Sequence, residues 1–423
     1  METQPLPVEI TKGRKEILLE RYLEIRKFTL EICNPLESED YVVQPIVDVS
    51  PPKWHLAHST WFFEEMLLKK IKAYKAFNPD YGYLFNSYYE SIGGGERVLR
   101  PERGRMTRPT VAKIIDYRHH VDKYMHEFLL NELSFEVMDL VELGLQHEQQ
   151  HQELLVTDIK YIFGHNPLFP VYLKSKLEQI EARELGWLHV EGGLYDVGYS
   201  GSEFCFDNEL SRHKSYIEPF KAMDRLVTAG EYLEFIEDGG YSEFQWWLSE
   251  GWDWVKTNKI LAPLYWHKVD GKWHHYTMSG FIPVNAQEPV THISYFEADA
   301  FSQWKNMRLL NENEWEVLTS TYGNLSNDGF VDRRNYHPGV AKGNNQLLGF
   351  CWEWTQSAYL PYPGFQKKKG AVGEYNGKFM INQMVLRGGS CATSMSHIRT
   401  TYRNFFHPHL RWQFTGIRLA ETI

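Results

Sequence analysis

A pair of histidines four residues apart sets the strongest constraint on how this chain can fold. His147 and His151 lie in the segment LGLQHEQQHQELL, residues 143–155, which has leucines near both ends. On an α-helix this spacing places both side chains on one face, one turn apart. Two imidazoles so placed can bind one metal ion and leave its other positions to a further ligand and to substrate. The segment predicts a buried bundle helix with part of a metal site, although such pairs also arise by chance on solvated helices.

A second histidine-bearing segment, VSPPKWHLAHSTWFFEEMLLKK at residues 49–70, contains two candidates for a further ligand. Pro51 and Pro52 suit the start of a helix, and most of the residues that follow are apolar. His55 and His58 lie within it, three residues apart. A histidine on an apolar helix face is more often a hydrogen-bonded core residue, but two candidate ligands elsewhere favour metal binding by one of this pair.

Helical periodicity dominates the first part of the chain. We expect helices at residues 13–32, 49–70, 109–131 and 134–163. Four helices with histidines projecting inward from two of them predict a metal-binding four-helix bundle over residues 10–165. The polar stretch 81–109, rich in glycine and arginine, is expected to be a functional loop whose arginines can pair with substrate carboxylates.

The remaining sequence shows little of this helical periodicity. Pro167, Pro170 and a charged run mark a linker at residues 166–185. From residue 186 to 423 the expected strands are short, and helices are expected at 228–240, 294–306 and 310–320, with Thr228 and Ser294 as N-caps. The fold class is therefore a multidomain α and α+β protein: a helical bundle followed by an irregular α+β domain. The chain has 43% apolar and 15% aromatic residues, enough for two large cores.

Charge and cysteine content exclude several classes of protein. The 45 basic and 55 acidic residues leave a net charge of −10, and we find no basic tract, so nucleic acid is not an expected partner. Four scattered cysteines make no CxxC pair, which favours a reducing compartment. The N-terminus lacks the apolar core of a signal peptide, and no stretch of about 18 apolar residues predicts a membrane span. A cytoplasmic protein is expected.

Two groups of motifs resemble known families. PPKWHLAHSTWFFE and HEQQHQE resemble the DinB-like four-helix bundle of the ergothioneine-biosynthetic sulfoxide synthases, the EgtB family. The second half resembles the formylglycine-generating-enzyme (FGE-sulfatase, sulfatase-modifying factor) domain, a variant of the C-type lectin fold. The residues that carry this second resemblance are GGLYDVG, LLNENEWEVL, GFCWEWTQSAYLPYPGF, LRGGSCAT and FTGIRLA. Together the two resemblances cover nearly the whole chain, in the order that the family has them.

The resemblance implies a metal site and a reaction. In the family, three histidines hold Fe(II), and the matching positions here are His58, His147 and His151, which leaves His55 as a supporting residue. Such a site leaves positions for a thiolate, an imidazole nitrogen and O2. The family joins the sulfur of a cysteine-type thiol to C2 of the imidazole of hercynine (trimethylhistidine) and oxidises that sulfur to the sulfoxide, with O2 as oxidant.

Substrate-binding and catalytic residues also follow from the resemblance. Gln150 matches the glutamine that hydrogen-bonds the hercynine imidazole, Asn404 matches the asparagine near its carboxylate or ammonium region, and Phe405 stands where some members place tryptophan beside the trimethylammonium group. Tyr88 and Tyr89 resemble a pair of tyrosines that one branch places near the iron as proton donors, and the choice between them stays open.

One position departs from the members that use γ-glutamylcysteine. These have an acidic residue two positions after the asparagine, where this chain has Phe406, so free cysteine is the expected thiol. Arg100, Arg103 and Arg387 are the candidates for binding substrate carboxylates. The oligomeric state stays open.

Several alternative functions remain at this point. One is the same chemistry on histidine, as in the OvoA enzymes, or with a selenium donor. Another is a zinc-dependent thiol transferase, since these also use DinB bundles with three histidines. A third is a non-catalytic lectin-like binding module, which would leave the three histidines unexplained. Formylglycine generation itself is not expected, because the stretch HIRTTYRNFFHPHLRWQFTGIRL lacks the cysteine pair that it needs, and we interpret Cys351 and Cys391 as core residues.

Overall fold

The computed structural model describes residues 13–423 except 88, 91–94, 175–180, 344 and 368–375. Its contacts define two compact units. The first comprises Met1–Val43, Ser50–Ser87 and Glu96–His151, and the second comprises Gln44–Val49, Tyr88–Gly95 and Gln152–Ile423. This division falls inside a helix, between His151 and Gln152, and not in the linker expected at residues 166–185. The predicted domain boundaries therefore stay a prediction.

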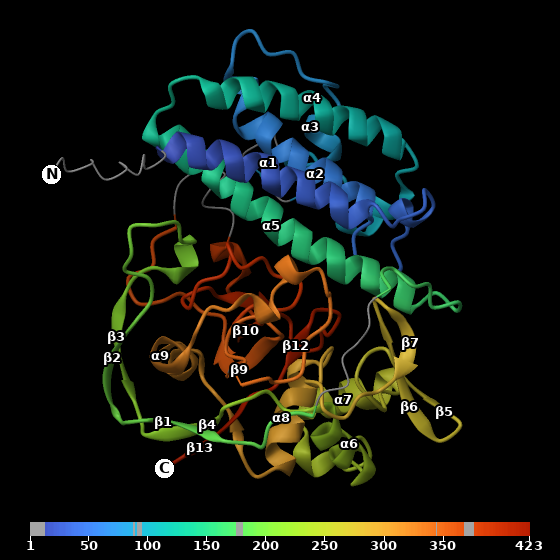
Figure 1. Cartoon of the computed structure of the whole chain (residues 1–423), viewed down its shortest axis with the longest axis vertical. Helices are drawn as coiled ribbons and strands as arrows, with labels where there is room; N and C mark the ends of the chain where they lie inside the picture. Colours follow the sequence, from blue (N-terminus) through green and yellow to red (C-terminus); the bar gives the residue numbers. More distant parts are fainter. Residues whose placement is uncertain (1–12, 88, 91–94, 175–180, 344, 368–375) are drawn as a thin grey trace, which may run out of the picture. The chain divides into compact units, whose positions relative to one another are not determined.

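The first unit is built from helices that pack side by side (Figure 1). They are α1 (Arg14–Cys33), α2 (Pro52–Met66), α3 (Tyr81–Leu84), α4 (Val111–Leu130) and the part of α5 (Phe135–Gly164) that ends at His151. The four long helices confirm the predicted bundle. The stretch 81–109 was expected to be loop throughout, but it contains α3 and a 3-10 helix, η4, at Arg100–Arg105.

Local signals explain where the bundle helices begin. Pro52 occupies the first turn of α2, where its missing N–H has no helical partner to lose. The Thr110 hydroxyl caps α4 by accepting a hydrogen bond from the Lys113 amide. Both starts lie within three residues of the predicted ones.

A buried ion network fixes the rotation of α5 against the other bundle helices. The Glu148 carboxylate accepts hydrogen bonds from Arg26 of α1, at 3.0 Å, from Thr29, at 2.6 Å, and from Arg118 of α4. Arg26 also donates to Asp122 at 2.6 Å. Because Arg26, Arg118 and Glu148 are all buried, these charges must pair with one another, and they determine which face of α5 turns towards α1 and α4.

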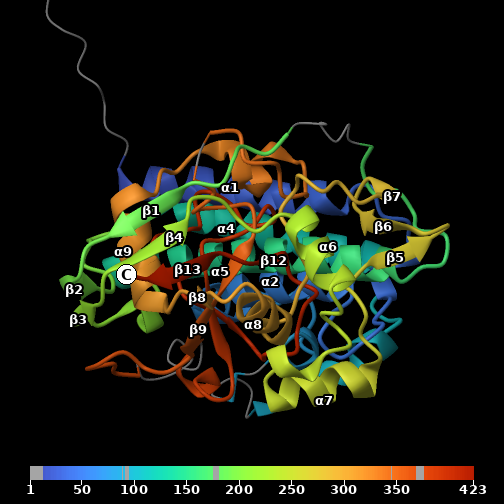
Figure 2. The same ribbon diagram turned by 90° about the horizontal axis from the view of Figure 1, so that it is seen from below.

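The described residues of the second unit form four small sheets. Their strand orders are β1-β4-β13-β8, β11-β10-β9-β12, β2-β3 and β5-β6-β7, and the first of these is visible in Figure 2. The strands are β1 (Trp187–Val190), β2 (Gly193–Val197), β3 (His213–Ile217), β4 (Phe220–Met223), β5 (Trp266–Val269), β6 (Lys272–Thr277), β7 (Gly280–Pro283), β8 (Arg308–Leu309), β9 (Trp352–Ala358), β10 (Met384–Arg387), β11 (Asn404–Phe406), β12 (Thr415–Gly416) and β13 (Leu419–Thr422). The expected α+β class is confirmed.

Four α-helices accompany these sheets in the part of the unit that the structure describes. They are α6 (Ala229–Glu237), α7 (Ser249–Asn258), α8 (Tyr295–Trp304) and α9 (Glu312–Tyr322). Thr228 and Ser294 are the N-caps of α6 and α8, as predicted, and each forms a reciprocal pair with a glutamate three residues later. Helix α7 was not predicted. It starts without a side-chain cap and contains Gly251, where a Cβ atom would stand 3.0 Å from Phe296.

The motifs of the second unit meet in its core. Arg418 of the FTGIRLA motif binds Glu353 of the CWEW motif through two hydrogen bonds, at 2.8 and 2.9 Å. Trp315 of LLNENEWEVL donates to the same carboxylate at 2.9 Å. Cys351 and Cys391 are buried free thiols, so their interpretation as core residues is confirmed. These motifs therefore build the fold.

The C-terminal half of α5 belongs to this core as well. Glu153 accepts hydrogen bonds from the Trp352 indole and, at 2.8 Å, from the Thr393 hydroxyl. Asp158 accepts one from the Trp412 indole at 3.0 Å. Among the described residues, no helix is long and apolar enough to span a membrane.

Candidate metal centre

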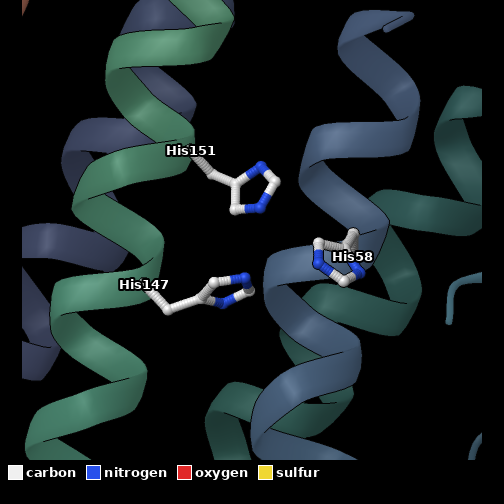
Figure 3. Close-up of side chains that lie close together, drawn as sticks. All are labelled: His58, His147 and His151. Carbon is white, nitrogen blue, oxygen red and sulfur yellow. The ribbon is translucent and has the colours of Figure 1, made fainter. Parts of the chain in front are cut away.

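Three histidines of the first unit converge from two helices. Figure 3 shows His147 and His151 projecting from α5 towards His58 on α2. All three are buried, and one ring nitrogen of each lies within 4.8 Å of the others. The ring centroids are 5.0 Å apart for His58 and His147, 4.8 Å for His58 and His151, and 4.6 Å for His147 and His151. The residues predicted from the two motifs are therefore brought together, and they can hold a metal ion.

His58 is oriented for coordination by its backbone partner. Its Nδ1 lies 2.6 Å from the carbonyl oxygen of Phe85, so a neutral ring donates its proton there. Its Nε2 is buried and has no hydrogen-bond partner among the described residues. An imidazole whose second nitrogen donates to a carbonyl is the usual arrangement of a metal-binding histidine. Nε2 is thus the atom of His58 that is available to a metal ion.

His55 is the hydrogen-bond partner of His151, as the Phe85 carbonyl is of His58. The Nδ1 atoms of the two rings are 2.9 Å apart, so one of them donates a hydrogen bond to the other. This contact leaves Nε2 of His151 as its coordinating atom. His55 therefore contacts one of the three converging histidines from behind, whereas His58 is itself one of the three that could hold a metal ion.

Burial keeps the three rings neutral. It lowers the pKa of His147 to about 4. It also lowers the pKa values of His58 and His151 well below 6.5, with a further contribution from the neighbouring histidines. Neutral imidazole is the form that binds metal, so the site needs no deprotonation at neutral pH. The donor set fits a divalent transition metal that accepts nitrogen ligands.

Close approach of α5 to α2 depends on Gly144, one turn before His147. A Cβ atom at Gly144 would stand 2.7 Å from Phe63 and 2.9 Å from Phe62, and both phenylalanines are buried. The missing side chain lets the two helices approach until His58 comes within reach of His147 and His151. Phe62 also packs against the His147 ring, with centroids 4.9 Å apart.

Two of the residues predicted to bind carboxylates lie in η4, and they differ in exposure. Arg100 is exposed, whereas Arg103 is buried, with its guanidinium carbon 3.4 Å from the centroid of the Trp54 ring. Arg103 donates to the hydroxyls of Ser50 at 3.0 Å and Ser87 at 2.9 Å. The positive charge of Arg103 contributes to the low pKa values of His58 and His151. Gln150, on α5 beside the metal ligands, is half-buried.

The residues predicted from the TYRNFFHP motif form strand β11 in the second unit. Asn404 pairs with Leu386 of β10, and its side-chain oxygen accepts a hydrogen bond from the Phe405 amide at 2.9 Å. Phe405 stacks on Tyr359 with centroids 4.0 Å apart, and Phe406 packs edge-on against Trp412 at 5.2 Å. Side chains alternate along a strand, so Asn404 and Phe406 share one face of the sheet and Phe405 has the other.

The remaining predicted site residues are Arg387, Tyr88 and Tyr89. Arg387 is fully buried and donates to the carboxylate of Glu316 and, at 3.1 Å, to the carbonyls of Thr400 and Thr401. These contacts hold β10 in the core and add no support for its predicted role in binding substrate. Tyr89 is buried, and Tyr88 lies outside the described residues.

The sequence interpretation missed part of the support for the histidines. Trp54 stacks on His58, with centroids 4.4 Å apart and planes at 15°. The spacing of four residues between Trp54 and His58 was a usable signal, because such pairs meet on one helix face. The Phe85 carbonyl could not be found in this way, because a backbone oxygen has no sequence signature.

Comparison with known proteins identifies the domains of the chain. The model of the sulfatase-modifying factor enzyme 1-like domain matches residues 174–336 and 335–423, and that of the DinB superfamily matches residues 21–155. A hercynine oxygenase of Mycobacterium tuberculosis is 33% identical over 304 residues, which cover 66% of this chain and 70% of that protein. One from Mycolicibacterium smegmatis is 31% identical over 306 residues, with the same two coverages of 66% and 70%.

A eukaryotic relative is more distant. Ergothioneine biosynthesis protein 1 of Schizosaccharomyces pombe is 25% identical over 231 residues, which cover 52% of this chain and 28% of that protein.

Proposed function

The chain belongs to the hercynine oxygenase family, and on that premise we propose that it is an O2-dependent, non-heme iron(II) sulfoxide synthase of ergothioneine biosynthesis. Its substrates would be hercynine, free cysteine and O2. The reaction joins the cysteine sulfur to C2 of the hercynine imidazole and oxidises that sulfur to the sulfoxide. One O2 supplies one oxygen to the sulfoxide and one to water, and the two hydrogens of that water come from the thiol and from C2.

The observation that carries the proposal is the buried set of three neutral histidines, with the Nε2 of His58 left without a hydrogen-bond partner among the described residues. Three imidazoles accept both iron(II) and zinc, so the donor set alone leaves the metal open. Family membership favours iron. Bound iron(II) would supply the redox chemistry with O2, and His58, His147 and His151 would hold it.

Other residues of the chain would bind and orient the substrates. Gln150, one residue before the ligand His151, is proposed to hydrogen-bond the hercynine imidazole. Asn404, on the same face of β11 as Phe406, would bind the carboxylate or ammonium region. The contact of an aromatic face with the trimethylammonium group is proposed from the family resemblance alone for Phe405, which lies on the other face of the strand. Its stacking on Tyr359 holds the Phe405 ring in one orientation.

A tyrosine phenol is proposed to provide a proton during sulfur oxidation. Tyr88 and Tyr89 are the two candidates. Burial of Tyr89 supports a role for its hydroxyl away from bulk water, where a positioned phenol is an efficient donor.

Free cysteine is the proposed thiol because the Phe406 side chain has no charge that could pair with the γ-glutamyl group of γ-glutamylcysteine. The Phe406 ring packs edge-on against Trp412, so an apolar contact stands two residues after Asn404. The γ-glutamyl group of γ-glutamylcysteine carries an ammonium and a carboxylate whose burial against apolar side chains is unfavourable. Arg100 and Arg103 remain the proposed partners of the substrate carboxylates. Arg103 already adds positive charge near the histidines, whereas Arg387 is engaged with Glu316.

The test is O2 uptake together with product mass. The protein is loaded anaerobically with Fe(II), and hercynine is paired in turn with cysteine and with γ-glutamylcysteine. We expect O2 consumption and the mass of a hercynine–cysteine sulfoxide. Uptake with γ-glutamylcysteine alone would refute the thiol assignment, and no uptake with iron bound would direct the search to histidine and selenium donors. If the protein binds zinc but not iron, a zinc-dependent thiol transferase would be the better supported function.

A further inference from the structure

We propose that His275, Glu288 and His337 of the second unit form an additional binding site for a divalent transition metal. His275 lies on β6, Glu288 follows β7 by five residues, and His337 lies beyond the 3-10 helix η8 (Val331–Arg333). One ligand atom of each lies within 4.8 Å of the others. Their exposed fractions are 8%, 5% and 6%, so the three groups meet inside the domain.

Hydrogen bonds within the described residues satisfy only part of this group of side chains. Nε2 of His337 and Oε2 of Glu288 are 2.8 Å apart. Two neighbouring ligands of one metal stand about 3 Å apart, given bonds of about 2.1 Å. Nε2 of His275 and Nδ1 of His337 are buried and have no hydrogen-bond partner in the described part of the chain. A hydrogen-bonded His337–Glu288 pair would not explain why the Nε2 of His275 is buried beside it.

The carboxylate is held in place by its own segment. The Asn285 side chain donates to Oε1 of Glu288 at 3.2 Å, and the Glu288 amide donates to the Asn285 carbonyl at 3.2 Å. The Glu288 carbonyl accepts a hydrogen bond from the Ala229 amide at 2.7 Å. With Oε1 engaged by Asn285, Oε2 is the oxygen directed at His337.

The surrounding charges are compatible with a bound cation. Burial lowers the pKa of His275 well below 6.5, with a contribution from His337, so its ring is neutral. The nearest strong base is Lys160, whose ammonium is 2.7 Å from the Nε2 of His292. Burial lowers the pKa of Lys160 to about 7, so its positive charge is reduced at neutral pH and lost in mildly alkaline solution.

The donor set selects the class of metal. Two imidazoles and one carboxylate suit Zn²⁺, Fe²⁺ or Co²⁺, whereas Ca²⁺ and Mg²⁺ prefer sets made of oxygen. Three protein ligands leave at least one coordination position. Because the site is buried, that position is closed to large ligands, and the metal would join β6 to the two segments that carry Glu288 and His337.

The experiment measures metal content in full-length protein made in zinc-supplemented medium. In a His147→Ala background, which disables the bundle site, we expect about one zinc per chain after gel filtration. Adding His337→Ala should remove it, and adding Glu288→Gln should weaken zinc affinity at least about tenfold. His274→Ala is the matched control, because His274 precedes His275 on β6 but points to the opposite face, and it should keep the zinc.

Two measurements separate metal loss from misfolding. Circular dichroism must show the same spectrum for the zinc-free and zinc-bound variants, and Co²⁺ added to the His147→Ala protein should produce visible absorption that Glu288→Gln changes. The proposal is overturned if the His147→Ala protein is folded but holds no zinc. It is equally overturned if His337→Ala and Glu288→Gln leave zinc content, zinc affinity and the Co²⁺ spectrum unchanged.

Discussion

The Glu148→Gln substitution tests whether buried charges hold the metal-binding helix. Burial alone would raise the pKa of Glu148, but the guanidinium groups of Arg118 and Arg26 outweigh it and lower that pKa from 4.5 to about 2. The difference between these two values corresponds to about 3 kcal/mol, at ~1.36 kcal/mol per pKa unit. Breaking a buried ion pair costs ~3–5 kcal/mol in other proteins, which agrees with this figure. We expect Glu148→Gln to lower the free energy of unfolding of the first unit by about 3 kcal/mol at pH 7.

The effect should depend on pH in one direction. A carboxyl group with a lowered pKa stabilises the folded state above its unfolded pKa, and this stabilisation is lost as the pH falls towards the folded value. The difference between wild type and Glu148→Gln should therefore be largest above pH 5 and shrink between about pH 4.5 and pH 2. Metal-free protein is used so that bound charge does not shift the titration.

Glu153→Gln is the matched control. Glu153 lies five residues later on α5 and is also buried, but its carboxylate is bound by Trp352, Thr393 and Ser390 rather than by arginines. Burial raises its pKa to about 6, so its ionisation opposes folding as the pH rises from about 4.5 to 6. At pH 7 the glutamine removes a penalty of about 2 kcal/mol and weakens one hydrogen bond, so the net loss should stay below ~1 kcal/mol.

The assay is urea denaturation combined with hydrogen exchange, read by mass spectrometry on peptides from α1 and α4 for Glu148 and from β9 for Glu153. These peptides assign each loss of stability to its own unit. Equal losses in the two variants at pH 7 would refute the reasoning. So would a loss in Glu148→Gln that stays constant from pH 7 to pH 3.

Four further predictions concern the site. His58→Ala should abolish iron binding, as measured by metal analysis, and leave the circular dichroism spectrum unchanged; full iron occupancy would contradict the ligand set. Gly144→Ala should destabilise the bundle by about 1–2 kcal/mol, because overpacking (~1–3 kcal/mol) exceeds the helix-propensity gain (up to ~1 kcal/mol), and should weaken iron affinity. Tyr89→Phe and Tyr88→Phe should slow sulfoxide formation relative to oxidation of the thiol alone, and unchanged product ratios in both would exclude them. Phe406→Asp should raise kcat/KM for γ-glutamylcysteine relative to cysteine by about tenfold, equivalent to ~1.4 kcal/mol; no change would remove Phe406 from thiol selection.

Features with short-range causes could be predicted from the sequence. Pro52 at the start of α2 and the caps Thr228 and Ser294 act within one helical turn, so a local motif is sufficient to place them. The spacing of His147 and His151 is equally local. Selection of His58 over His55 came from family resemblance, and the contact of His58 with Phe85 now supplies its physical reason.

Features that depend on the fold could not be predicted in this way. His275, Glu288 and His337 come from three separate segments, and nothing in their spacing indicates that they meet. Helix α7 was missed because Gly251 lowers helix propensity, and the close packing of Gly251, where a Cβ atom would stand 3.0 Å from Phe296, is visible only in the fold. The hydrogen bond from Arg387 to Glu316 could not be predicted either, since the sequence does not distinguish a buried structural arginine from a substrate-binding one.

The short run HEQQHQE serves three purposes because an α-helix turns by about 100° per residue. His147 and His151 share the face that meets His58, whereas Glu148 is turned towards Arg26 and Arg118. Glu153 is turned further, towards Trp352 and Thr393. Rotation of α5 by one residue would separate both glutamates from their partners, so the orientation of the helix is fixed without a metal ion. Loss of one histidine should therefore remove the metal but keep the fold. Loss of Glu148 should first destabilise the fold, and should weaken metal binding only as a consequence.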